Sequence, residues 1–231
     1  NVGRISEIIS STDSVAGDDL YLSIDADLQK ATYLALQNEI AAIVYSNIKS
    51  GEIPINDVYT ALIGNSVINT EHFSKAKASD TEKNVLSVFK SRQKTTLGKI
   101  KQELTSSPEA LNTMSDEVLD EFTYIISMLK DDQVLLKNEI DTSDSVYQKW
   151  KNQKISPKEY LSYCITQHWI DISQLNVDEK YADSTEVYDA LCKYILKNIK
   201  TDTEFSKIIY QYMITRGEIS PRQLCLILFD Q

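Results

Sequence analysis

Helix-capping signals recur along this chain from residue 55 onward, and each precedes apolar residues spaced three to four positions apart. The clearest is Ser79-Asp80-Thr81-Glu82, a capping box in which the serine hydroxyl and the glutamate carboxylate each accept a backbone N–H left free by the first turn. The apolar positions behind it fall on one helical face: Val85, Phe89, Leu97, Ile100 and Leu104. The sequence therefore predicts a mainly α protein, a bundle or array of several helices.

Further helices are predicted on both sides of this one. Residues 56–63 have a helical pattern, and Ser115-Asp116-Glu117 begins a second long helix. The inward positions of that second helix are Val118, Leu119, Phe122, Ile125, Ile126, Leu129 and Leu136. Since both long helices approach the length of a bundle rod, we expect them to pack antiparallel. Shorter helices are predicted after the caps at 156–159, 184–186, 201–204 and 220–223.

Three of the helix starts resemble one another. Gly51-Glu52-Ile53-Pro54, Lys154-Ile155-Ser156-Pro157 and Gly217-Glu218-Ile219-Ser220-Pro221 each place an isoleucine one or two residues before a short apolar helix. An isoleucine there can pack onto the first helical turn. Recurring cap chemistry and duplication of a helical-hairpin module both explain the similarity.

Composition agrees with an ordered helical chain and excludes some partners. Only 6 of the 231 residues are Gly and 4 are Pro, while 42% are hydrophobic. The formal net charge of −10 disfavours nucleic acid and anionic membrane surfaces, because it offers no basic stripe to offset phosphate repulsion. Without an apolar run of membrane-spanning length, no direct membrane insertion is predicted.

The N-terminal quarter has a different pattern. Residues 1–17 predict a short strand and a turn, and Leu20, Leu22 and Ile24 then alternate with polar residues as in a half-buried strand. Asp25 ends that strand and is expected to N-cap a long amphipathic helix.

The expected organisation is a short β arm over 1–25 and a helical domain over 26–231. That domain comprises a junction helix (26–50), a long-helix part (51–140) and shorter capped helices (141–231). Residues 42–54 fit either the end of the junction helix, near Ser50-Gly51, or a strand-turn-strand.

The segment Gly17-Asp18-Asp19-Leu20-Tyr21-Leu22-Ser23-Ile24-Asp25-Ala26-Asp27-Leu28-Gln29, followed by Ala35-Leu36, resembles a known motif. It is similar to the G-x-D-hydrophobic-x-L-[ST]-I-D-x-x-L-Q…A-L segment of class B penicillin-binding proteins. In that family the segment links the non-catalytic pedestal, or dimerisation, region to the transpeptidase domain. The resemblance covers about a sixth of the chain and implies a structural hinge made of these residues: Leu22, Ile24, Asp25, Leu28 and Gln29.

The resemblance implies a parent protein that cross-links peptidoglycan through a serine acyl-enzyme, as a D,D-transpeptidase. It also implies an extracytoplasmic location with a membrane anchor in the parent. The expected partners are the transpeptidase domain of the same chain and a cell-wall synthesis protein, such as the polytopic glycosyltransferase with which class B members work. The helices after residue 50 would then be an insertion.

The catalytic motifs of that family are missing from this stretch. There is no Lys-Thr-Gly, and the nearest string, Lys94-Thr95-Thr96, falls within a helical pattern. Ser-x-x-Lys occurs at 46–49, 74–77, 87–90 and 127–130, but four matches in a helical chain rich in Ser and Lys indicate chance. We therefore expect a non-catalytic accessory or scaffold domain without a cofactor. A free-standing all-helical protein-binding module is the alternative, and an independent hydrolase is a weaker one because the sequence offers no nucleophile-base pair.

The other reactive side chains favour structural roles. Cys164, Cys192 and Cys225 lie in apolar helical settings and are predicted to be buried free thiols. His168 is expected to pack on the apolar side of its helix, and His72 to be a surface or cap residue. Neither has a metal ligand at a suitable spacing.

Two side-chain groups allow a second interpretation. The acidic clusters at 116–121, 131–132 and 141–144 are expected to be solvated or to compensate helix dipoles, since the last lacks the Gly and distal Glu of a calcium loop. Several of the 13 tyrosines lie on apolar stripes, among them Tyr160, Tyr188 and Tyr212, with the hydroxyl expected at the surface. A tyrosine-lined peptide groove is the alternative for these.

Overall fold

The computed structural model describes residues 17, 25–47, 53–106, 109–177 and 182–230. The fold is mainly α. The chain divides into two compact units, residues 1–52 and residues 53–231. The helices described are α1 (Ala26–Asn47), α2 (Ile55–Gly64), α3 (Asp80–Thr105), α4 (Asp116–Asp131), α5 (Ser145–Lys151), α6 (Pro157–Thr166), α7 (Ser184–Ile199), α8 (Thr203–Thr215) and α9 (Pro221–Asp230), with short 3-10 turns η1 (Thr70–Ser74), η2 (Leu111–Thr113) and η3 (Ile172–Gln174).

Within the first unit, the structure places α1 as a single helix and confirms its predicted N-cap. The Asp25 carboxylate accepts hydrogen bonds from the backbone N–H of Asp27 at 2.9 Å and of Leu28 at 3.1 Å. The predicted helix is confirmed as far as Asn47. The β arm predicted over 1–25, apart from its residues 17 and 25, lies outside the described residues. Residues 48–52 of the ambiguous 42–54 stretch also lie outside them.

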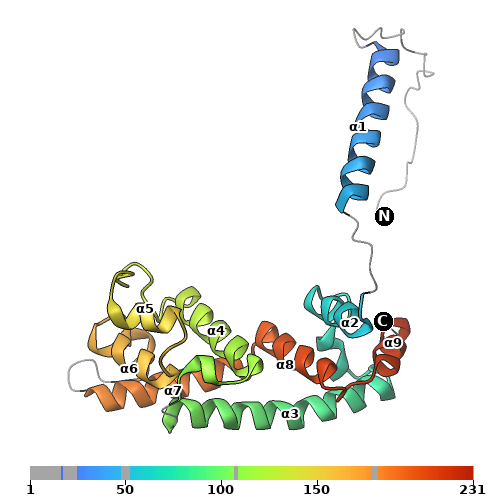
Figure 1. The fold of residues 1–231 in the computed structure, drawn as a ribbon. Coiled ribbons are helices and arrows are strands. Elements are labelled where there is room, and N and C mark those ends of the chain that lie inside the picture. The colour runs from blue at the N-terminus through green and yellow to red at the C-terminus, as the bar shows by residue number, and fades with distance from the viewer. Residues whose placement is uncertain (1–16, 18–24, 48–52, 107–108, 178–181, 231) are drawn as a thin grey trace, which may run out of the picture. The chain divides into compact units, whose positions relative to one another are not determined.

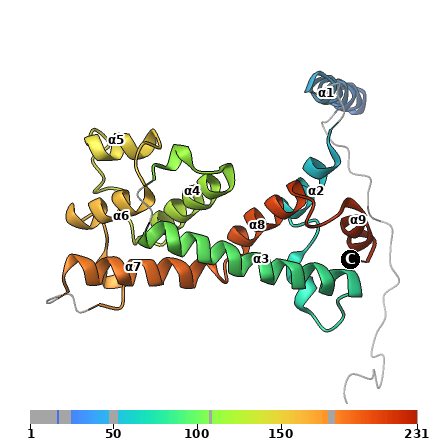
Figure 2. The same ribbon diagram turned by 60° about the horizontal axis from the view of Figure 1, so that its bottom comes forward.

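The second unit is organised along α3, the longest helix described. At 1.5 Å per residue its 26 residues extend about 39 Å. Figures 1 and 2 show α9 beside its N-terminal half and α6 and α7 beside its C-terminal half, with α8 between them. α2 packs on α8 and α9. The predicted capping box of Ser79 and Glu82 is present. One continuous hydrophobic core runs along the unit from Tyr59 to Ile227.

Two expectations about the long helices are wrong. α3 packs chiefly against η1 and α6 to α9, and α4 against α7, α8 and η2, so the two long helices are not an antiparallel pair of rods. α4 ends at Asp131, before Leu136, because Gln133 adopts a left-handed backbone with φ +60°. A residue in that conformation terminates a helix by directing its N–H back to the last turn.

A second kind of chain reversal, distinct from the turn at Gln133, occurs four times in this unit. Ser66, Gln153, His168 and Gly217 each have positive φ, between 57° and 71°. The next backbone N–H bonds to the carbonyl five residues earlier at 2.8 or 2.9 Å, which is the Schellman motif. A buried isoleucine follows at the second position after the turn: Ile68, Ile155, Ile170 or Ile219.

Each isoleucine directly precedes an N-cap, provided by Asn69, Ser156, Asp171 or Ser220. The predicted recurrence of isoleucine before a cap is thus confirmed at 154–157 and 217–221, and it extends to two turns that sequence reading missed. The first predicted case differs, because Ile53 is exposed and Pro54 makes no side-chain cap. Short helices that end and restart within four residues can stack closely along α3.

Replacing Gly217 with alanine is expected to lower the unfolding free energy by about 1 kcal/mol, because φ +71° disfavours any residue with a Cβ. No atom lies within 4 Å of the added Cβ, so the cost comes from the backbone alone. The control is Gly98→Ala in α3, also in open space, where helix propensity should add up to about 1 kcal/mol. Urea unfolding followed by circular dichroism measures both. Equal effects from the two substitutions would contradict the role given to Gly217.

Candidate functional site

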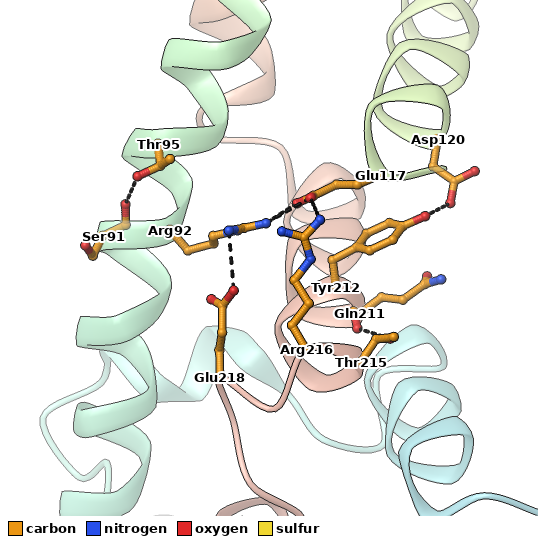
Figure 3. Close-up of polar contacts among 10 residues, drawn as sticks. All are labelled: Ser91, Arg92, Thr95, Glu117, Asp120, Gln211, Tyr212, Thr215, Arg216 and Glu218. Atoms are coloured by element: carbon orange, nitrogen blue, oxygen red, sulfur yellow. Dashed lines mark hydrogen bonds and ion pairs between the residues drawn. The ribbon is translucent and has the colours of Figure 1, made fainter. Parts of the chain in front are cut away.

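A cluster of charged side chains joins α3, α4, α8 and the turn into α9 (Figure 3). Arg92 lies in the middle of α3, Glu117 in the first turn of α4 and Arg216 at the end of α8. Glu218 follows Gly217 in the turn before α9. We call these four residues the ion-pair network. The first and last of them, Arg92 and Glu218, span 127 residues of sequence, so only the folded chain forms the network.

Glu117 is the centre of the ion-pair network. Its carboxylate accepts from Arg92 Nη2 at 2.6 and 2.9 Å and from Arg216 Nη2 at 2.5 Å. Arg92 Nη1 lies 3.3 Å from Glu218 Oε1. The side chains of Glu117 and Arg92 are only 5% and 13% exposed, so the central pair is largely removed from water. Two guanidinium charges thus balance two carboxylates at the junction of three helices.

Local structure explains these positions. Glu117 lies where the positive end of the α4 dipole favours a carboxylate, and Arg216 is the C-cap of α8, where the dipole favours a cation. Arg92 continues the stripe of Val85 and Phe89, so α3 turns its guanidinium toward the interior.

Glu121, one turn after Glu117, is a second buried carboxyl and is 2% exposed. Burial, and next the negative charge of Glu117, raise its pKa to about 8 against the opposing effects of Arg92, Lys99 and Arg216. Glu121 is therefore mostly protonated at neutral pH. The 116–121 cluster was expected to be solvated or to compensate the helix dipole. Asp116 and Asp120 are exposed, and Glu117 lies in the first turn of α4, so the expectation is wrong only for Glu121, which is buried one turn further along.

The hydroxyl groups around the network are engaged locally. Thr95 donates to Ser91 O at 3.2 Å, Thr215 to Gln211 O at 2.9 Å and Tyr212 to Asp120 Oδ2 at 2.6 Å (Figure 3). The two threonine bonds lie within α3 and within α8, while the tyrosine bond joins α8 to α4. Together with the ion-pair network, the tyrosine bond holds α4 against α8.

Tyrosine-aspartate bonds provide similar ties elsewhere. Tyr124 donates to Asp202, the N-cap of α8, at 2.7 Å, and Tyr163 donates to Asp144, the N-cap of α5, at 2.8 Å. Tyr188 donates to the Leu104 carbonyl at 2.7 Å. Tyr160 does not bring its hydroxyl to the surface as expected, because it is fully buried.

His72 contacts the N-terminal cap of α3, whereas His168 is exposed in the turn after α6. His72 Nδ1 lies 2.7 Å from Glu82 Oε1, beside the α3 capping box, so the expected surface or cap position is confirmed. The expected packing of His168 is wrong: the residue follows α6, is exposed and adopts φ +59°. In the sequence the apolar pattern of α6 continues through His168 to Trp169. It therefore did not indicate that the helix ends before His168.

The three cysteines are free thiols, as predicted. Cys164 and Cys192 are buried, and Cys225 is half-buried. Burial raises the pKa of Cys164 to about 12 and of Cys192 to about 11, so these two stay protonated and poorly nucleophilic at neutral pH.

The Ser-x-x-Lys strings gain no catalytic geometry. Ser87–Lys90 and Ser127–Lys130 lie on α3 and α4, and Lys94-Thr95-Thr96 lies within α3 as predicted. In the described chain, neither Ser127 nor Ser87 bonds to its lysine. Lys49 lies outside the described residues.

Of the five motif residues, Leu22 and Ile24 lie outside the described part, while Asp25 caps α1. Gln29 donates its backbone N–H to the Asp25 carbonyl at 2.9 Å, and the Leu28 side chain is 66% exposed.

A surface pocket of about 310 Å³ lies between α4, α5 and the turn that leads to α6. Trp150, Lys130, Lys151 and Gln153 line it together with apolar side chains of α4. This pocket is the second candidate site.

The described residues contain no grouping of three or more histidine, cysteine or acidic side chains placed to hold a metal ion. No described helix has the length and apolar character needed to cross a membrane. Comparisons with protein-family models, curated proteins and solved structures find no match to this chain.

Proposed function

We propose that this chain is a non-catalytic accessory segment of a class B penicillin-binding protein. In that role it spans the junction between pedestal and transpeptidase regions and carries a helical insertion. The observation that carries the proposal is the Leu22-Ser23-Ile24-Asp25…Leu28-Gln29 motif, in which Asp25 has the capping role that the family's strand-to-helix junction requires.

The surface of α1 supports this role. Leu28, Leu36 and Ile40 are 66%, 59% and 60% exposed, so the helix presents apolar side chains to solvent. An amphipathic helix gains most of its stability from burying such a face. The resemblance implies that the transpeptidase domain of the parent chain packs against these apolar side chains of α1.

The packing of two helices in the second unit supports the proposed insertion. Its first helix, α2, packs beside α9, the last helix described (Figures 1 and 2). A domain can be inserted into another without distorting it when the two connections lie close together. The insertion would then project from the junction and hold the catalytic domain at a defined position, or dock a cell-wall synthesis protein.

The test is covalent labelling of the complete gene product with a fluorescent β-lactam, read on a denaturing gel. We expect label on the complete protein and none on the chain of residues 1–231, because a penicillin-binding serine would lie outside this chain. The coding sequence should then contain Ser-x-x-Lys, Ser-x-Asn and Lys-Thr-Gly after the present segment. A folded complete protein that takes no label would contradict the proposal, and label on residues 1–231 would contradict its non-catalytic role.

The alternative is a free-standing helical protein-binding module. The pocket beside Trp150 favours it, because apolar pockets with a few polar groups are typical of binding sites. A coding sequence without the three transpeptidase motifs would move the choice to this alternative.

A further inference from the structure

The pocket beside Trp150 combines apolar walls with a size that limits its ligand. Leu119, Ile126 and Trp150 provide the apolar surface. Its volume of about 310 Å³ lies at the small end of ligand pockets, which run from roughly 300 to 1,000 Å³. It therefore suits one side chain and an adjoining polar group better than an extended ligand.

The indole of Trp150 is held rigidly. Its ring stacks on Tyr160 with centroids 4.5 Å apart and planes 6° from parallel, and Tyr160 is itself fully buried. A fixed aromatic surface binds an apolar side chain without first losing conformational freedom.

Of the polar side chains that line the pocket, Thr123 donates to Leu119 O at 2.7 Å, while four others lack partners among the described residues. Among the described residues, the side chains of Lys130, Lys151, Gln153 and Ser127 make no hydrogen bond or ion pair with the protein. This contrasts with the tyrosines and aspartates nearby, which bond to each other. No carboxylate lines the pocket, although the chain has 34 acidic and 24 basic residues. The pocket is thus a small cationic area on an acidic protein, and an ammonium group there would favour an anion.

We propose that this pocket binds the C-terminal residue of a peptide. The apolar side chain of that residue lies against Trp150, and its α-carboxylate pairs with Lys130 and Lys151. A free phosphate would leave the apolar walls unused, whereas a terminal residue uses both kinds of surface. The inference goes beyond the proposed function and does not depend on it.

The test uses the full chain, labelled with ¹⁵N, and two probes: N-acetyl-Ala-Leu and its C-terminal amide. The chain has two tryptophans, so its NMR spectrum has two indole N–H signals, and Trp150→Phe assigns them. We expect the acid to shift the Trp150 signal in a saturable way and to leave buried Trp169 unchanged. The amide, which lacks the charge, should bind at least tenfold more weakly.

Matched lysine variants separate a specific site from general charge. Lys130→Gln with Lys151→Gln should weaken binding of the acid at least tenfold. Lys149→Gln with Lys154→Gln makes the same charge change at exposed neighbours outside the pocket lining and should alter binding less than twofold. Unchanged thermal unfolding would show that both variants are folded. Equal binding of acid and amide, no shift at millimolar probe, or equal loss in the two double variants would overturn the inference.

Discussion

Replacing Glu117 with glutamine is expected to lower the unfolding free energy by about 3 kcal/mol. The substitution keeps the shape of the side chain but leaves Arg92, whose side chain is 13% exposed, facing Arg216 without a carboxylate between them. Removing one partner of a buried ion pair costs roughly 3–5 kcal/mol, because the remaining charge stays desolvated and uncompensated. The partial exposure of Arg216, and the contact that Arg92 keeps with Glu218, place the expectation at the lower end. Urea unfolding at pH 7 measures it.

Asp131→Asn provides the control for this change. Asp131 is exposed at the end of the same helix, so the variant alters the net charge equally but should change stability by no more than about 0.5 kcal/mol. A second comparison replaces Arg92, Glu117 and Arg216 with methionine or leucine and Glu218 with glutamine, which should recover most of the loss because no charge of the network remains unpaired. If Glu117→Gln costs no more than Asp131→Asn, the network does not stabilise the helix junction.

Helix starts were predictable from this sequence because their chemistry is local. Ser79 with Glu82, Ser156 and Asp202 each satisfy N–H groups within the next three residues, so the pattern and the contact lie in one short window. At α7, Asp183 and Ser184 are adjacent and either side chain could accept the free N–H groups of the first turn. The prediction was off by one residue there, because Asp183, not Ser184, caps the helix.

The ion-pair network was not predictable in the same way. Glu117 meets partners 25 residues before it and 99 residues after it, so the sequence of α4 does not identify these partners. One signal was present: Glu117 and Glu121 are four residues apart and adjoin the apolar stripe of Phe122 and Ile125. Arg92 likewise continues the stripe of its helix. Charged residues on both apolar faces indicate a buried pair, but not which residues meet.

Helix ends were also harder to predict than helix starts. Four of the five described residues with positive φ are not glycine, namely Ser66, Gln133, Gln153 and His168. Glycine is the usual marker of such a turn, so its absence hid three of the four recurring reversals. The buried isoleucine and the N-cap that follow each reversal were the more informative pattern.

Replacing Glu121 with glutamine is expected to remove a pH dependence of stability. The pKa of Glu121 is about 8 in the folded chain against 4.5 for an ordinary glutamate, so between these values the folded state holds a proton that the unfolded state has lost. The unfolding free energy should therefore fall as pH rises from 4.5 to 8, and then level off. At 1.36 kcal/mol per pKa unit, with relaxation around the charged form, we expect a fall of about 3 kcal/mol.

Glutamine cannot ionise, so Glu121→Gln should match the wild type near pH 4.5 and exceed its stability by about 3 kcal/mol at pH 9. Subtracting the two profiles cancels the titration of the other groups, which both proteins share. The control is Glu139→Gln, the same chemical change at an exposed residue, for which the difference from wild type should stay nearly constant with pH. Urea unfolding at pH 5, 7 and 9 measures the three proteins. A difference between Glu121→Gln and wild type that does not grow with pH would mean that Glu121 ionises normally despite its burial beside Glu117.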